Sequence, residues 1–156
     1  MERIVGVSGG FDPIHIGHIR YLKDAAEVGL VQVYLTTDEW LIRKKGYRLI
    51  AWEMRKQLLE EYPFVHEVLP QLEDPDDTAA ASLAHYRPQV FAKGGDRTID
   101  NLPEAEIEVC QNFNIEIVTG IGGKDKPASS SDLFKDAIRQ YAKNKGIDEI
   151  RKILPK

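Results

Sequence analysis

The feature that most constrains this chain is a regular alternation of short β-rich runs with helical patterns. Strands are predicted at residues 3–8, 31–35, 66–69, 89–92 and 115–118, and helices at 19–28, 52–62, 77–86, 103–112, 131–142 and 148–154. Strands separated by helices pair in parallel, because the helix carries the chain back across one face of the sheet. The pattern therefore predicts an α/β fold with a doubly wound parallel five-stranded sheet and helices on both faces.

The composition is that of one ordinary globular domain. The chain has 156 residues, 42% hydrophobic and 29% charged, which suits a single domain over residues 1–156. No apolar run approaches the roughly 20 residues of a membrane span, and the start lacks a signal-peptide pattern. The single cysteine, Cys110, has no partner for an internal disulfide and favours a cytoplasmic location. The net charge of −4 disfavours nonspecific nucleic-acid binding, which needs a broad cationic surface.

Most of the Gly, Lys, Arg, His and Ser clusters fall in four predicted loops that follow strands. These loops span residues 8–18, 36–48, 93–103 and 119–131. Ligands of open parallel sheets bind beyond the carboxyl ends of the strands, where the strand order reverses, so functional residues are expected here. The second loop and the helix after it are strongly basic, and a solvated surface is the alternative interpretation. The cations of this stretch are Arg43, Lys44, Lys45, Arg48, Arg55 and Lys56.

The first loop has the residues of a phosphate site. Gly9 and Gly10 let the backbone approach an anionic ligand closely, and a helix that begins near Gly17 offers unpaired N–H groups. His15 and His18 are three residues apart, so they converge on one face of the first helical turn. Two imidazoles beside a triphosphate donate hydrogen bonds to its oxygens while charge builds on the transferring phosphorus.

Two simpler interpretations of this histidine pair stay open. The pair has the spacing of two metal ligands, but no third Cys, His or carboxylate stands nearby at a metal-site spacing, so no metal site is expected. The pair also suits a helix cap and a surface residue. The context favours the phosphate site, because a strand, Gly-Gly-Phe-Asp-Pro, His-x-Gly-His and an amphipathic helix follow one another.

The segment 9–29, GGFDPIHIGHIRYLKDAAEVG, resembles the opening of the cytidylyltransferase-like nucleotidyltransferase superfamily. That superfamily includes glycerol-3-phosphate cytidylyltransferase and the adenylyltransferase domain of the bifunctional heptose enzyme. Later motifs follow in family order over nearly the whole chain. The resemblance implies a Rossmann-like fold and the reaction of a nucleoside triphosphate with a small phosphorylated metabolite, which releases pyrophosphate.

The resemblance, together with the loop chemistry, implies a role for each residue of the expected site. Catalytic roles are expected for His15, His18 and Lys45. Nucleotide contacts are expected for Gly9, Gly10, Phe11, Asp12, Gly17, Lys44, Gly94, Asp96, Ser129, Ser130 and Ser131, and acceptor contacts for Lys44, Arg55 and Lys124.

Three of these assignments also have a structural alternative. Arg55 suits a salt bridge equally well, Asp96 suits a turn after two glycines, and the serines 129–131 suit a helix N-cap. An N-cap does not exclude an anion site, because free N–H groups lie at the same helix end.

The motif Lys93-Gly94-Gly95-Asp96 with Pro103-Glu104 favours ATP, with Mg²⁺, and a sugar or polyol phosphate. A CTP-dependent enzyme acting on a polyol or amino-alcohol phosphate is the alternative. Glycerol phosphate is disfavoured, because the acidic stretch 73–77 stands where its enzymes carry a substrate lysine, and Lys124 replaces an arginine.

Two other classes of protein remain open. One is a non-catalytic nucleotide-binding regulatory module, and the other is an aminoacyl-tRNA synthetase fragment, which the acidic charge disfavours. The expected partners are the triphosphate, the phosphorylated metabolite and, as an option that the sequence does not decide, a second copy in a homodimer. No nucleic acid or membrane partner is expected.

Overall fold

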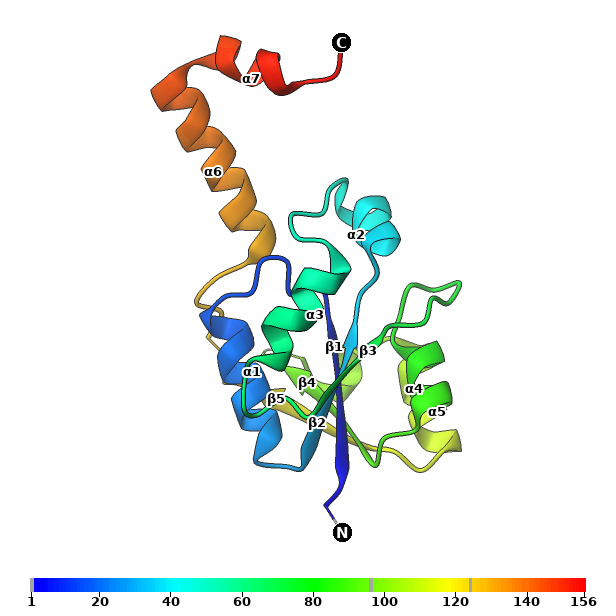
Figure 1. Ribbon diagram of the computed structural model, residues 1–156. Helices are drawn as coiled ribbons and strands as arrows, with labels where there is room; N and C mark the ends of the chain where they lie inside the picture. The colour runs from blue at the N-terminus through cyan, green and yellow to red at the C-terminus, as the bar shows by residue number, and fades with distance from the viewer. Residues whose placement is uncertain (1, 96, 124) are drawn as a thin grey trace.

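The sheet lies at the centre of the molecule. The computed structural model describes residues 2–95, 97–123 and 125–156. In this part of the chain, five parallel strands pair in the order β3-β2-β1-β4-β5 (Figure 1), which confirms the predicted α/β sheet. The strands are β1 (Ile4–Gly9), β2 (Leu30–Leu35), β3 (Glu67–Pro70), β4 (Val90–Gly94) and β5 (Glu116–Ile121).

Helices connect these strands and extend beyond the last one. They are α1 (Ile16–Ala26), α2 (Asp38–Lys45), α3 (Trp52–Glu60), α4 (Ala80–Tyr86), α5 (Glu104–Asn112), α6 (Ser130–Lys145) and α7 (Ile147–Ile153), with a 3₁₀ turn at Ile99–Asn101. Figure 1 shows α6 leading away from the sheet, with α7 at its far end. None of the described helices is both long and apolar enough to cross a membrane.

The two faces of the sheet carry separate cores, because side chains alternate along a strand. Val33 and Leu35 of β2 pack into the cluster that also contains Leu22 of α1 and Leu59 of α3. Tyr34, between them, belongs to the opposite cluster, which is built from α4 and α5. Its buried members are Tyr34, Ala79, Leu83, Phe91, Cys110 and Ile115. Helices therefore cover both faces, as the strand–helix alternation predicts.

Helix α2 occupies a stretch expected to be a loop. Thr37 caps its start by accepting a hydrogen bond from the Trp40 N–H at 3.2 Å, and Gly46 ends it with φ +86°. Only Leu41 of this helix is buried, so no apolar periodicity indicated it. The capping residues were nevertheless in the sequence, with acidic residues in the first turn and basic residues in the last.

The reversal of strand order lies between β1 and β4. The chain builds β1, β2 and β3 toward one edge and then returns to place β4 on the other side of β1. A crevice beyond the carboxyl ends of β1 and β4 is therefore where a ligand is expected.

Candidate active site

A pocket of about 790 Å³ lies at this reversal point. Ser8 of β1, Gly94 of β4 and Ile121 of β5 line it, so it spans the carboxyl ends of three strands. Each of the four predicted loops contributes to its wall. The predicted site residues that line it are His15, Gly17, His18, Lys45, Gly94, Ser129, Ser130 and Ser131.

The two histidines are fixed by the start of α1. His15 is the N-cap, and its Nδ1 accepts the Gly17 N–H at 3.1 Å. The His18 Nδ1 accepts the His15 N–H at 3.2 Å, which completes a reciprocal capping arrangement. The two rings stack with centroids 3.7 Å apart. The predicted convergence on one face is therefore observed, and the histidine cap that was the simpler alternative is part of the same geometry.

Both imidazoles are neutral donors in the free protein. Burial, with help from His15 and Lys45, lowers the pKa of His18 to about 3. Burial and the Lys45 charge also hold the pKa of His15 below its ordinary value. Each Nδ1 accepts a backbone hydrogen bond, so a neutral ring carries its proton on Nε2. The pair thus offers two N–H donors to an anion in the pocket and no acidic proton near pH 7.

Phe11, expected at the nucleotide, is instead a core residue that packs against His18. Its side chain is 4% exposed and belongs to the core, and its ring centroid lies 4.8 Å from that of His18. Gly9 and Gly10 are not among the residues that line the pocket, and a Cβ at Gly9 would meet the Phe11 ring and one at Gly10 would meet Leu41. Gly17 is required locally, since its Cβ would lie 2.9 Å from Cε1 of the His15 ring.

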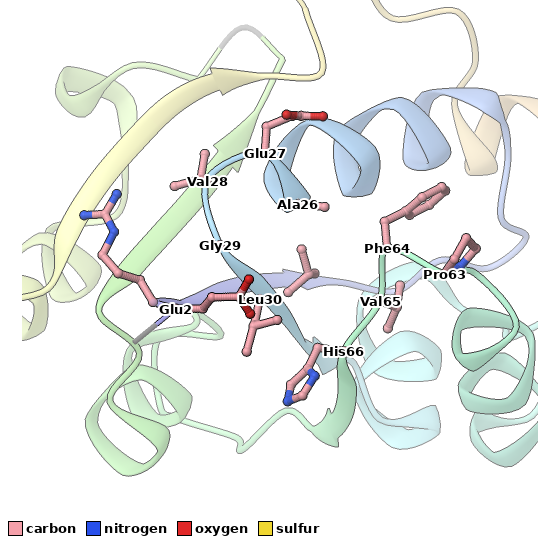
Figure 2. A pocket seen from close by; sticks show the side chains of 12 residues that line it. Glu2, Ala26, Glu27, Val28, Gly29, Leu30, Pro63, Phe64, Val65 and His66 are labelled. Carbon is pink, nitrogen blue, oxygen red and sulfur yellow. The ribbon is translucent and has the colours of Figure 1, made fainter.

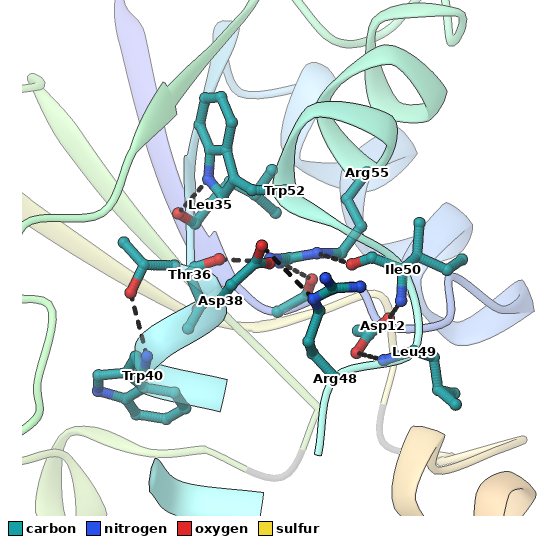
Figure 3. Close-up of polar contacts among 12 residues, drawn as sticks. Asp12, Leu35, Thr36, Asp38, Trp40, Arg48, Leu49, Ile50, Trp52 and Arg55 are labelled. Carbon is teal, nitrogen blue, oxygen red and sulfur yellow. Dashed lines mark hydrogen bonds and ion pairs between the residues drawn. The ribbon is translucent and has the colours of Figure 1, made fainter. Parts of the chain in front are cut away.

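Asp12 and Arg55 form a structural network beside the pocket (Figure 3). The Asp12 carboxylate accepts the N–H groups of Leu49 and Ile50, both at 2.7 Å. Arg55 is fully buried and donates to the carbonyls of Gly10, Thr36 and Ile50 and to Asp38, each at 2.8 Å. These contacts use four of its five N–H donors, and Arg55 does not line the pocket, so the structure favours the salt-bridge alternative over the expected acceptor contact. Asp12 likewise holds the chain rather than the nucleotide.

The adjacent lysines Lys44 and Lys45 point to different partners. Lys45 lines the pocket. Lys44 lies outside the pocket lining and pairs with Asp77, with 3.1 Å between Nζ and Oδ2. Arg43 reaches the same carboxylate at 2.7 Å, so the acidic stretch 73–77 neutralises the outer side of α2. The basic cluster is therefore divided between a pocket face and a surface face.

We expect Lys45→Ala to lower kcat and kcat/KM together by at least about tenfold, because a cation near the transferring phosphorus acts on charge that grows in the transition state. Lys44→Ala is the matched control and should stay within about threefold, under 0.7 kcal/mol. Steady-state kinetics on both variants measure this difference. Equal effects of the two substitutions would remove the distinction between the two faces.

Sequence reasoning missed several pocket residues on the β4 and β5 side. These are Tyr21, Lys93, Gly95, Arg97, Gly122, Gly123, Asp125, Lys126, Pro127 and Ala128, besides Ser8 and Ile121. A usable signal existed for Lys93, which stands at a strand end directly before two glycines. Asp96 and Lys124, both expected at the ligands, lie outside the described residues.

The serines at the start of α6 serve two purposes. Ser129 is the N-cap, and its hydroxyl accepts the Asp132 N–H. Ser130 donates its hydroxyl to the Pro13 carbonyl at 2.9 Å, which ties α6 to the first loop. All three serines line the pocket, so the amino end of α6 faces it with its partial positive charge.

A second hollow, of about 510 Å³, lies at the opposite end of the sheet (Figure 2). It is lined by residues at the amino ends of β1 and β2, such as Arg3 and Gly29, and by His66 before β3. Its described lining contains none of the predicted site residues. The larger pocket is therefore the candidate active site.

Imidazole donors, a lysine and a helix amino end surround one pocket of a doubly wound parallel sheet, an arrangement that suits an anionic ligand. The sequence model of the family described as cytidylyltransferase-like matches residues 7–142. The chain belongs to this cytidylyltransferase-like family.

Curated relatives extend this likeness along the chain. Bifunctional protein HldE of Geobacter sulfurreducens is 29% identical over 143 residues, which cover 90% of this chain and 28% of that protein. Bifunctional protein HldE of Geotalea uraniireducens is 33% identical over 126 residues, which cover 79% and 25%. The chain thus spans about a quarter of the length of the curated relatives it matches.

A solved structure shares the fold. The lipopolysaccharide core biosynthesis protein from Thermoplasma volcanium GSS1 superimposes with a TM-score of 0.63 at 23% identity, covering 80% of this chain and all of that one.

Proposed function

We propose that the chain transfers the nucleotidyl group of ATP to the phosphate of a small phosphorylated sugar or polyol and releases pyrophosphate. The observation that carries this proposal is the stacked, neutral His15–His18 pair, which faces the same pocket as Lys45. The likeness to the bifunctional HldE proteins supports a sugar phosphate as acceptor. Both substrates bring phosphates, and the pocket offers hydrogen-bond donors and cations to hold them.

The proposed reaction is an in-line displacement at phosphorus. An oxygen of the acceptor phosphate attacks the α-phosphorus of ATP, and the bond to pyrophosphate breaks on the opposite side. Pyrophosphate leaves with the bonding electron pair. The Nε2–H groups of His15 and His18 donate to oxygens on the α-phosphorus, and Lys45 offsets the remaining charge. In this proposal the imidazoles act as hydrogen-bond donors that stabilise charge on the α-phosphorus.

Mg²⁺ fits this pocket as an ion carried by the triphosphate. No group of three His, Cys, Asp or Glu side chains in the described residues has the arrangement of a metal site. Mg²⁺ takes most of its ligands from phosphate oxygens and water and needs only one or two carboxylates from a protein. Asp125 lines the pocket and offers such a carboxylate. Bound there, the ion would draw electron density from the phosphate oxygens.

ATP and CTP in competition test the nucleotide. We expect a higher kcat/KM for ATP, since the Lys-Gly-Gly-Asp element that begins at Lys93 in β4 resembles that of the ATP-using heptose branch. Pyrophosphate release, measured across a panel of sugar and polyol phosphates, gives both values. A preference for CTP would favour the cytidylyltransferase alternative. Nucleotide binding with no turnover on any acceptor would favour the regulatory module.

We propose a homodimer through the outer face of α6. Leu133, Ile138 and Tyr141 leave apolar surface exposed on this helix. Its first half carries Asp132 and Asp136, and its last turn carries lysines. A two-fold axis perpendicular to α6 would set the paired helices antiparallel and bring the aspartates of one helix toward the last-turn lysines of the other. Light scattering after size-exclusion chromatography should give twice the chain mass, and a monomer at micromolar concentration would refute this.

The free thiol of Cys110 supports a cytoplasmic location.

A further inference from the structure

A second cationic wall faces the pocket from β4. Lys93 lines the pocket, although its side chain is only 17% exposed. Its Nζ lies 5.0 Å from the centroid of the Phe91 ring and 3.6 Å from Oε1 of Glu106. Arg97 lines the pocket a few residues further along the chain. The ammonium of Lys93 is thus largely withdrawn from water yet borders the space that a ligand would fill.

Glu106 places a buried carboxylate behind this lysine. It lies on α5 with its side chain 4% exposed, and its Oε2 accepts the Ala79 N–H at 3.0 Å. Its Oε1 has no hydrogen-bond partner among the described residues. A buried charge is costly unless an opposite charge compensates it. A neutral glutamine could accept the Ala79 N–H equally well. The negative charge of Glu106 is therefore needed only for its ion pair with Lys93.

We propose that Lys93 binds a phosphate oxygen of a substrate and that Glu106 is the positioning residue that holds Lys93 charged and directed at the pocket. The first half of this inference rests on the proposed function, whereas the relation between the two side chains does not. The histidine pair and Lys45 occupy one wall, and Lys93 and Arg97 supply the cations for a second phosphate group. ATP and the acceptor are the two sources of that phosphate.

The groups around Lys93 predict its titration. Burial lowers its pKa, the Glu106 charge opposes that shift, and the Arg97 charge adds to it. Two other titratable groups lie near the carboxylate: Tyr21 of α1 and Cys110 of α5 both have pKa values raised by burial and then by Glu106. Both are neutral at physiological pH. Without the charge of Glu106, Lys93 should therefore lose its proton at a lower pH.

The experiment reads Lys93 directly. The protein is labelled with ¹³C-lysine, and the Cε signal of Lys93, assigned by its loss in Lys93→Arg, is titrated by NMR. We expect the Lys93 pKa in Glu106→Gln to fall by at least about one unit, a tenfold change in the proton equilibrium. Glu108→Gln, an exposed position on the same helix, is the control and should leave the titration unchanged. An unchanged Lys93 titration in Glu106→Gln overturns the positioning role.

Calorimetry with Mg-ATP and with inorganic phosphate tests the binding role and separates the two sources of phosphate. Lys93→Met should weaken one of these ligands at least tenfold. Glu106→Gln should weaken the same ligand more at pH 9 than at pH 7. Lys93→Arg in the Glu106→Gln background should lose that pH dependence, because arginine stays charged. If Lys93→Met binds both ligands as the parent does, the binding role is wrong. If the parent does not bind Mg-ATP, the proposed function fails, while the NMR titration still decides the pairing.

Discussion

His18→Asn is expected to lower kcat by roughly a hundredfold or more, the scale of deleting one transition-state donor. The asparagine oxygen can replace Nδ1 as the acceptor of the His15 N–H, so the start of α1 keeps its cap. What this variant loses is the Nε2–H donor that faces the pocket. Steady-state kinetics measure the effect, and a thermal melt within a few degrees of the parent confirms that the fold is intact.

His18→Gln is the matched variant, because the longer amide can bring its N–H₂ group close to the position of Nε2. This variant should recover part of the kcat lost in His18→Asn, although glutamine caps the start of α1 less well than asparagine does. The opposite order, with asparagine active and glutamine inactive, would make His18 a structural cap. Activity within a few-fold of the parent in both variants would exclude a catalytic role. His15→Ala should resemble His18→Asn in kcat but also lose the N-cap, worth about 1 kcal/mol.

The sheet and its loops could be predicted because their signals are local. Each strand is a short apolar run, and the reversal of strand order then places the loops after β1, β4 and β5 in one pocket. Helix α2 was missed because apolar periodicity was the criterion and α2 buries only Leu41. A search for caps would have found it between Thr37 and Gly46.

The site was predicted less completely, because its support comes from residues distant in sequence. Motif position placed Phe11 and Asp12 at the nucleotide, but one fills the core below His18 and the other binds two N–H groups of a later segment. Spacing alone does not decide between adjacent lysines either, and the ion pair of Lys44 with Asp77 is a long-range contact. Chemistry at the pocket surface follows from a motif, whereas the contacts that hold that surface do not.

Arg55 is the clearest case of this long-range support. The apolar residues of α3 predict an inner face of Met54, Leu58 and Leu59, but of these only Leu59 is buried, and Met54 and Leu58 are 58% and 39% exposed. The buried face carries Arg55 and Leu59. A charged residue can take a core position only when its donors are satisfied. Here the carbonyls of Gly10 and Thr36 do so, from the ends of two strands that the helix sequence does not reveal.

Arg55→Met is therefore expected to destabilise the fold by about 3–5 kcal/mol, the cost of breaking a buried pair from one side. The methionine fills similar space but leaves three carbonyls without their donor and Asp38 without its closest cation. Urea unfolding of the parent and the variant gives the difference directly. Lys56→Ala, one position further along α3, removes only a surface pair with Glu60 and should change stability by less than about 0.5 kcal/mol.

Arg55→Lys separates the structural role from the acceptor contact that the sequence suggested. Lysine keeps the charge but reaches fewer of the four acceptors, so the variant should lose about half as much stability as Arg55→Met and keep the acceptor KM of the parent. The KM is unaffected because Arg55 does not line the pocket and four of its five guanidinium N–H donors bind protein groups. If Arg55→Lys left stability unchanged and raised the acceptor KM, Arg55 would instead contact the acceptor. The carbonyls of Gly10 and Thr36, the residues directly after β1 and β2, would then need another hydrogen-bond donor.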